Sequence, residues 1–165
     1  MKNNSLILCL LGVLFFTSVN GQNEKFKALF IYNFTNYIDW PYYGGSSFII
    51  AVIGDSPIIS ELEAISKIKS VGKLSIEVKK ISSASEIGNA SIVYVPGAKK
   101  RILPELSQAC AGKAVLIISD EAGGNFGINF TEINQKQSFQ ISKSNIEAHH
   151  LKVNSNLIAL GTSVN

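Results

Sequence analysis

Three short apolar runs constrain the fold more than any other feature of this sequence. They are Phe48–Ile53, Ile92–Val95 and Ala114–Ile118, and within them apolar residues do not alternate with polar ones. Continuous apolar runs of this length are typical of strands buried on both faces, as in a parallel sheet with helices on each side. The core of this chain is therefore expected to be such a sheet.

The segments between these runs have helical patterns. Ile58–Lys67 and Ala98–Ala111 place apolar residues at steps of three and four, and Ser56 followed by Pro57 is typical of a helix start. Leu74–Val78 alternates apolar with polar residues, which predicts a half-buried edge strand. Strands and helices thus alternate up to residue 118, as in parallel α/β folds with right-handed crossovers.

The last third of the chain follows a different pattern. Ile128–Phe130 and Phe139–Ile141 are separated by a polar stretch and predict an antiparallel hairpin. Ser144–His149 and Ser155–Leu160 have the length of short helices. The predicted fold is α/β, a three-layer sandwich with a mostly parallel central sheet plus a C-terminal antiparallel hairpin, in a single domain over residues 22–165.

A stretch rich in aromatic residues, Glu24–Pro41, precedes the first strand. Its apolar residues recur at helical spacing, which predicts that one face packs on the sheet, while Lys25 and Lys27 lie off that face. Because proline lacks an N–H, we expect the helix to end by Asp39. The residues expected to face inward are Phe26, Leu29, Phe30, Phe34, Tyr37 and Ile38.

The first residues have the pattern of a secretory signal peptide. Lys2 supplies the positive charge and Leu6–Phe16 an apolar run that is too short to span a bilayer. Val19 and Gly21 suit the positions before a cleavage site, so we predict cleavage after Gly21. The mature protein is then expected to be exported, with Cys110 as its single cysteine and no internal disulfide.

Charge and motifs argue against several function classes. The formal net charge is +3 and the lysines are scattered, which argues against a nucleic-acid-binding surface. The sequence contains no nucleophile motif, phosphate-binding loop or strong metal-ligand spacing. His149 and His150 are adjacent and point apart on a helix, so a surface metal site with Glu147 is only a weaker alternative to a polar helix end. We predict no catalytic residues, no metal and no cofactor.

One candidate ligand site follows from the predicted topology. The loops containing Asp55 and Ser56, Gly97, and Ser119 and Asp120 should meet at the carboxyl ends of parallel strands. Ligands of open α/β sheets bind at this edge, at a point where the strand order reverses. The alternative is ordinary turn and helix-cap chemistry, in which these residues bind no ligand.

Several of these segments together resemble the YfiR family. The aromatic stretch carries Lys27, Phe30, Tyr32-Asn33-Phe34, Tyr37 and Trp40-Pro41, similar to the opening signature of that family. Further similar segments are Gly54-Asp55, Leu116-Ile117-Ile118-Ser119-Asp120, Gly127-Ile128-Asn129-Phe130, Phe139-Gln140-Ile141 and Ser155-Asn156-Leu157. The chain departs from the family in Gln140 and Ser142, where members commonly have Glu and Asn, and in lacking the cysteines that form disulfides in better-known members.

The resemblance implies a function as well as a fold. It implies a non-enzymatic periplasmic regulator that binds a membrane signalling protein, a diguanylate cyclase or a sensor kinase, and restrains it until an envelope signal arrives. Trp40, Tyr42 and Tyr43 are candidate contacts, because Trp and Tyr dominate interface hot spots. A second copy of the chain is a further candidate partner. The alternative function is a periplasmic small-ligand-binding module that uses the strand-end loops.

Overall fold

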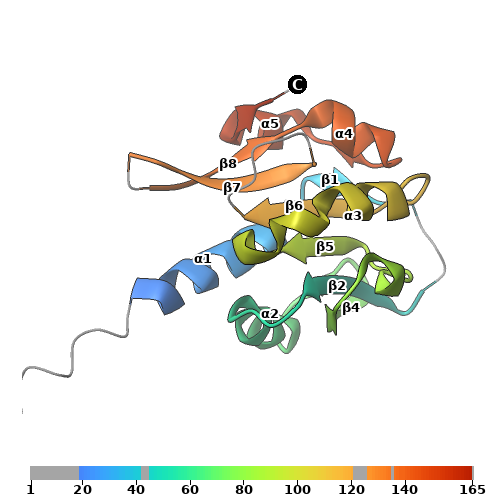
Figure 1. The fold of residues 1–165 in the computed structure, drawn as a ribbon, viewed down its shortest axis with the longest axis horizontal. Coiled ribbons are helices and arrows are strands. Elements are labelled where there is room, and N and C mark those ends of the chain that lie inside the picture. Colours follow the sequence, from blue (N-terminus) through green and yellow to red (C-terminus); the bar gives the residue numbers. More distant parts are fainter. Residues whose placement is uncertain (1–18, 42–44, 121–125, 135, 165) are drawn as a thin grey trace, which may run out of the picture.

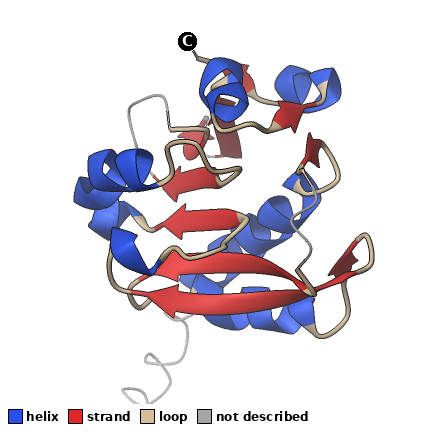
Figure 2. Ribbon diagram, turned by 90° about the vertical axis from the view of Figure 1, so that its right-hand side faces the viewer, coloured by secondary structure: helices blue, strands red, loops and turns tan. Residues whose placement is uncertain are grey.

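A computed structural model describes residues 19–41, 45–120, 126–134 and 136–164. Its main feature is one eight-stranded sheet, mostly parallel, with helices on both faces (Figures 1 and 2). A separate two-stranded sheet joins two distant segments. The predicted α/β sandwich with a C-terminal hairpin is confirmed.

The main sheet has the strand order β10-β8-β7-β6-β5-β2-β4-β3. The pairs β2–β4, β2–β5, β5–β6, β6–β7 and β8–β10 are parallel, whereas the hairpin pair β7–β8 and the pair β3–β4 are antiparallel. The small sheet pairs β1 with β9. The strands are β1 (Ile38–Asp39), β2 (Ser47–Ile53), β3 (Ser70–Val71), β4 (Leu74–Ile81), β5 (Ile92–Val95), β6 (Leu116–Asp120), β7 (Ile128–Ile133), β8 (Lys136–Ile141), β9 (Lys152–Val153) and β10 (Thr162–Ser163).

Helices cover both faces of this sheet. Figure 1 shows α4 and α5 at one end of the molecule and α2 at the other. Within the described residues, none of the helices combines the length and apolar character that crossing a bilayer requires. The helices are α1 (Val19–Phe34), α2 (Ile58–Ser66), α3 (Leu103–Ala109), α4 (Lys143–Ala148) and α5 (Ser155–Leu160), with 3₁₀ turns η1 (Ala84–Glu86) and η2 (Gly97–Ile102).

Two hydrophobic cores explain the continuous apolar runs. Successive residues of a strand point to opposite faces of the sheet. In β2, Phe48, Ile50 and Val52 pack in the core that contains α1, α2 and α5 residues. Ile49, Ala51 and Ile53 of the same strand pack in the core under η1 and α3. Because both faces are covered, neither set can be polar.

The aromatic helix ends well before its predicted limit. α1 ends at Phe34, which agrees with an end by Asp39, but Tyr37 and Ile38, which fit the helical spacing, lie outside the helix. The Thr35 hydroxyl donates to the carbonyl of Tyr32 at 2.6 Å, and the chain then turns. Ile38 pairs with Val153 in the small sheet instead of continuing the helix. Tertiary pairing with a segment more than a hundred residues away decided this boundary.

Three other details of the helices and strands also differ from the predictions. α2 begins at Ile58 after Pro57, and no side chain caps it, so the expected capping by Ser56 is wrong. The helix predicted over Ala98–Ala111 is divided into η2 and α3, with Pro104 in the first turn of α3. A proline is tolerated there because the first N–H groups of a helix have no partner within it. β6 lies two residues later than predicted and includes Ser119 and Asp120.

The predicted signal peptide is mostly outside the described part of the chain. Residues 1–18 are not described, and residues 19–21 form the first turn of α1. Cleavage after Gly21 therefore stays a prediction.

Gly127 provides a test of the packing between β6 and β7. Its φ is +119°, and a Cβ there would lie 2.5 Å from the carbonyl oxygen of Ile117. Since both the conformation and the contact involve backbone, we expect Gly127→Ala to lower the free energy of unfolding by roughly 2 kcal/mol or more. Urea denaturation measures this. Gly45→Ala, whose Cβ would meet only an atom 3.8 Å away, is the matched control and should be near neutral.

Candidate functional site

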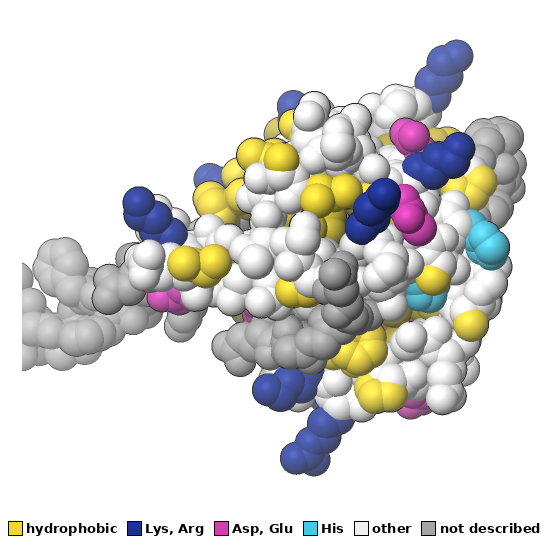
Figure 3. Space-filling view, turned by 90° about the horizontal axis from the view of Figure 1, so that it is seen from above, with side chains coloured by type: hydrophobic (Ala, Val, Ile, Leu, Met, Phe, Trp, Pro, Cys, Tyr) yellow, Lys and Arg dark blue, Asp and Glu magenta, His cyan; other side chains and the backbone are white. Residues whose placement is uncertain are grey.

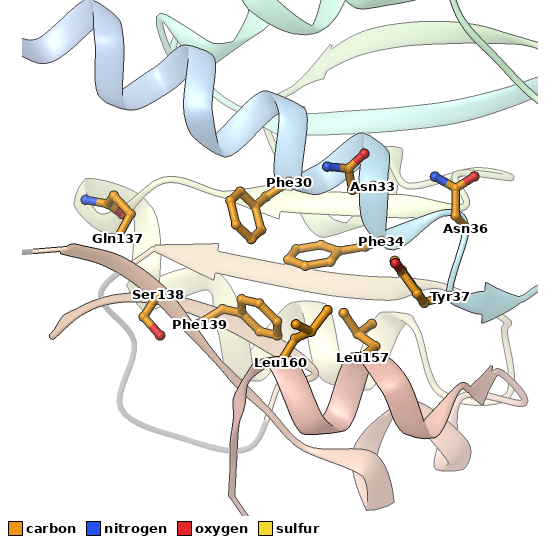
Figure 4. A pocket seen from close by; sticks show the side chains of 10 residues that line it. All are labelled: Phe30, Asn33, Phe34, Asn36, Tyr37, Gln137, Ser138, Phe139, Leu157 and Leu160. Atoms are coloured by element: carbon orange, nitrogen blue, oxygen red, sulfur yellow. The ribbon is translucent and has the colours of Figure 1, made fainter.

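A groove of about 650 Å³ lies between α1, β8 and α5. Figure 4 shows Phe30 and Phe34 of α1 on one side of the groove and Phe139 of β8 with Leu157 and Leu160 of α5 on the other. Among the described residues that line it, none carries a charge. They are Phe30, Asn33, Phe34, Asn36, Tyr37, Gln137, Ser138, Phe139, Leu157 and Leu160. Such a groove suits an apolar occupant.

Aromatic packing holds the floor of this groove. The ring centroid of Phe34 lies 5.0 Å from that of Phe139 and 6.0 Å from that of Phe130. Phe30 contacts Phe139 edge to face at 5.9 Å. These separations are in the range that aromatic pairs prefer, and each pair contributes roughly 0.5–1.5 kcal/mol beyond area burial. The floor is therefore part of the core and is formed in the free protein.

Exposed apolar side chains extend beyond the groove along α1. Phe26 is 40% exposed and Leu29 is 43% exposed, so the prediction that both face inward is wrong. In Figure 1, the first turns of α1 and the tip of the β7–β8 hairpin extend on the same side past the parallel strands. Part of α1 is therefore not covered by the sheet. Across the groove, Leu160 of α5 is 65% exposed. We call Phe26, Leu29 and Leu160 the apolar rim.

Lys27 occupies an inward position that the sequence analysis assigned to the exposed face. It is 5% exposed, and its Nζ donates to Asp120 Oδ2 at 2.7 Å and to Glu24 Oε1 at 3.1 Å. Burial alone would lower the pKa of Lys27, but the hydrogen bonds and charges of Asp120 and Glu24 raise it above its ordinary value. The ion pair thus fixes the start of α1 to the carboxyl end of β6, which corrects the prediction for Lys27.

The strand-end loops lie at one edge of the sheet, as the parallel pairing of β2, β5 and β6 requires. Asp55 is exposed, and its carboxylate accepts a hydrogen bond from Lys80 at 2.7 Å. That bond, the charge of Lys80 and the charge of Lys99 lower the pKa of Asp55. Lys99 also packs against Gly54, whose φ is +69°.

Besides Asp55, two more of the five predicted ligand residues have partners inside the protein. Ser119 is fully buried and donates to the side-chain oxygen of Asn129, and Asp120 pairs with Lys27. Ser56 and Gly97 are half-buried. Ligand binding by Asp55, Ser56, Gly97, Ser119 and Asp120 stays a prediction.

A second pocket, of about 550 Å³, lies at the amino ends of the parallel strands. Trp40 lines it, with its indole N–H donating to the carbonyl of Ser91 at 3.2 Å and its ring 5.0 Å from Phe48. Trp40 is half-buried, so part of its surface is committed to the fold. Tyr42 and Tyr43 lie outside the described residues, and a partner interface at Trp40, Tyr42 and Tyr43 stays a prediction.

Two other side chains with reactive groups, those of Cys110 and His149, are buried. Burial raises the pKa of the Cys110 thiol to about 11. A ring nitrogen of His149, Nδ1, lies 3.1 Å from the Cys110 carbonyl, which joins α4 to α3. Within the described ranges, no three His, Cys, Asp or Glu side chains are grouped to hold a metal ion.

Figure 3 shows lysine and acidic side chains scattered over the face that α4 and α5 form.

A comparison with models of known protein families identifies the family of this chain. The model of the YfiR/HmsC-like family, DUF4154, matches residues 24–162. The match covers most of the chain, including α1 from Glu24 onward, the sheet up to β10 and the groove. The protein therefore belongs to the YfiR/HmsC-like family. A search of curated proteins gave no match.

Lys27 gives a prediction with a defined pH dependence. A lysine whose pKa is raised by folding contributes stability that is present below its unfolded pKa, about 10.4, and is lost as pH rises through the folded pKa. We expect Lys27→Met to cost roughly 1–3 kcal/mol at pH 7, because two carboxylates lose their partner. The difference in free energy of unfolding between Lys27→Met and the native protein should narrow above about pH 10.5.

Urea unfolding at pH 7, 9 and 11 measures that difference. Lys25→Met removes an exposed lysine two residues away and is the control, with a small effect on the free energy of unfolding expected. A difference for Lys27→Met that stays constant from pH 7 to 11 would contradict the assignment.

Proposed function

We propose that this protein is a non-enzymatic periplasmic regulator that binds the periplasmic part of a membrane signalling protein and holds it inactive. The signalling protein is a diguanylate cyclase or a sensor kinase. Membership of the YfiR/HmsC-like family supports the regulatory class. The observation that carries the proposal is the preformed uncharged groove with its apolar rim.

The apolar rim is the reason to favour a protein partner. Phe26 and Leu29 lie on consecutive turns of α1, and Phe26 packs on Phe30 with ring centroids 4.6 Å apart. Aromatic side chains that are already ordered lose little conformational entropy on binding. A contiguous apolar surface that is bordered by polar residues is characteristic of protein interaction sites. The rim and groove together form our candidate partner surface.

Inhibition by binding requires different affinities for two states of the partner. A regulator that bound the active and inactive states equally would not change the ratio of the two states. To reduce the active fraction from half to about 1%, it must favour the inactive state about 100-fold, or roughly 2.7 kcal/mol. One or two buried apolar side chains supply free energy of that size. The rim is therefore large enough to account for the regulation.

The alternative function is a small-ligand-binding module. The pocket at Trp40 and the strand-end loops are the two places that favour it. Trp40 is the only tryptophan of the chain, so its fluorescence would report a ligand entering the first of these. Replacing Asp55 and Asp120 would test the second: loss of ligand binding with intact partner binding would support the module.

The regulatory proposal predicts a measurable change in the cell. Deleting the gene from its host should raise intracellular cyclic-di-GMP if the partner is a cyclase, and expressing the protein again should restore the lower level. The double variant Phe26→Ser, Leu29→Ser should fail to restore the lower level, because it removes two half-exposed apolar side chains from the candidate partner surface and leaves the buried core residues unchanged. Mass spectrometry of cell extracts measures the nucleotide.

A control separates loss of the interface from loss of an apolar residue. Ile68 is 78% exposed just beyond α2, so Ile68→Ser removes a similar side chain away from the rim. It should restore the low level fully. A photo-crosslinking amino acid at position 26 should capture a membrane signalling protein. Unchanged cyclic-di-GMP together with no such crosslink would contradict the proposed function.

A further inference from the structure

The outer edge of β8 is only partly paired. β10 runs parallel to it and pairs Thr162 with Gln140 and Ser163 with Ile141. Among the described residues, no strand pairs with Lys136–Phe139 on that side. This part of β8 therefore presents an open strand edge, and open edges are templates for the addition of another strand.

The hydrogen bonds of the hairpin show which backbone groups face this edge. Val164 N–H donates to the carbonyl of Ile141 at 2.9 Å, so the Ile141 backbone points away from β7. Ser142 N–H, by contrast, donates to Gly127 at 2.8 Å on the β7 side. Because this direction alternates along a strand, the backbone of Gln137 points outward like that of Ile141. The N–H and carbonyl of Gln137 therefore point to the open edge.

The groove reaches this edge where β10 stops. Gln137, Ser138 and Phe139 all line it, although the side chains of Ser138 and Phe139 point to opposite faces of the sheet. The groove therefore extends along this end of β8. Figure 4 shows Ser138 and Gln137 at the end of the groove away from Tyr37.

Gly161 marks the limit of the existing pairing. It precedes β10 in extended conformation, and a Cβ on it would overlap the ring of Phe139. α5 ends at Leu160, so the chain leaves the sheet edge at this point. Beyond it the edge of β8 continues toward Lys136 with no covering strand among the described residues. An added strand would thus continue the line of β10.

We infer that an extended segment of the partner's periplasmic part adds as a strand to the outer edge of β8 beside Gln137, in line with β10, and places apolar side chains in the groove. This inference rests on the proposed function and specifies how the partner binds. In strand addition, main-chain hydrogen bonds provide affinity and pockets for alternate side chains provide specificity. The segment is expected to carry apolar residues at alternate positions and no charge between them, because the groove lining carries none.

Proline at position 137 tests the inference directly. Gln137→Pro removes the outward N–H and leaves the β7–β8 hydrogen bonds in place, since edge strands tolerate proline. Gln137→Ala removes the same side chain but keeps the N–H, and is the matched control. We expect Gln137→Pro to lose most of the restoration of low cyclic-di-GMP in the deletion strain, and Gln137→Ala to restore it as well as the native protein does. Equal melting temperatures of the two purified variants establish that both are folded.

Amide hydrogen exchange of the purified native chain provides a second test that needs no partner. The Gln137 amide should exchange at least about tenfold faster than the Ser138 amide, because Ser138 faces its pairing partner Thr131 in β7. Protection of Gln137 equal to that of Ser138 would overturn the inference, since the edge would already be covered.

The outcomes separate this inference from the proposed function. If the native protein restores low cyclic-di-GMP and Gln137→Pro does so equally well, the partner binds elsewhere; strand addition is then wrong while the regulatory function stands. If the native protein itself has no effect and captures no membrane protein, the proposed function fails first. If the native chain is a dimer in sedimentation and Gln137→Pro is a monomer, the edge pairs with a second copy, which also overturns the inference.

Discussion

The packing of three phenylalanines between α1 and the hairpin is the interaction on which the rest of the structure depends. Phe34 of α1 contacts Phe130 of β7 and Phe139 of β8, so one side chain joins the N-terminal helix to the last strands of the sheet. The loss of a buried phenylalanine typically costs 3–5 kcal/mol, which is a large part of the stability of a domain this size. Without this contact neither the groove floor nor the orientation of the rim would be defined.

The same packing explains why the proposed partner surface lies beside a core. The C-terminal half of α1 is covered by the sheet, while its first turns extend past the strands and keep Phe26 and Leu29 half-exposed. Lys27 supports these turns through its ion pairs with Glu24 and Asp120. A rigid helix with an exposed apolar face presents its side chains at low entropic cost to a partner. Stability and recognition thus use adjacent residues of one helix.

Much of the architecture could be predicted from periodicity, because burial on both faces leaves a clear pattern. The run Phe48–Ile53 became a strand with both faces buried, and the alternation in Leu74–Val78 became a half-buried strand near the sheet edge. α5 has the bounds that its pattern predicted. The candidate site was harder to predict from the sequence. Phe26 and Leu29 fit the helical stripe as well as Phe34 does, and periodicity cannot show where the sheet beneath a helix ends.

The sequence by itself determined the order of strands and helices, the hairpin and the family, because these follow from local patterns of apolar, polar and turn-forming residues. Only the tertiary structure decided that α1 ends at Phe34, that Lys27 is buried and that part of β8 has an open edge. Each of these depends on a segment distant in the chain: β9 pairing with β1, Asp120 meeting Lys27, and β10 beginning beside Gln140. Local patterns record which side chains avoid water, whereas the identity of the partner that covers them is set when the whole chain packs.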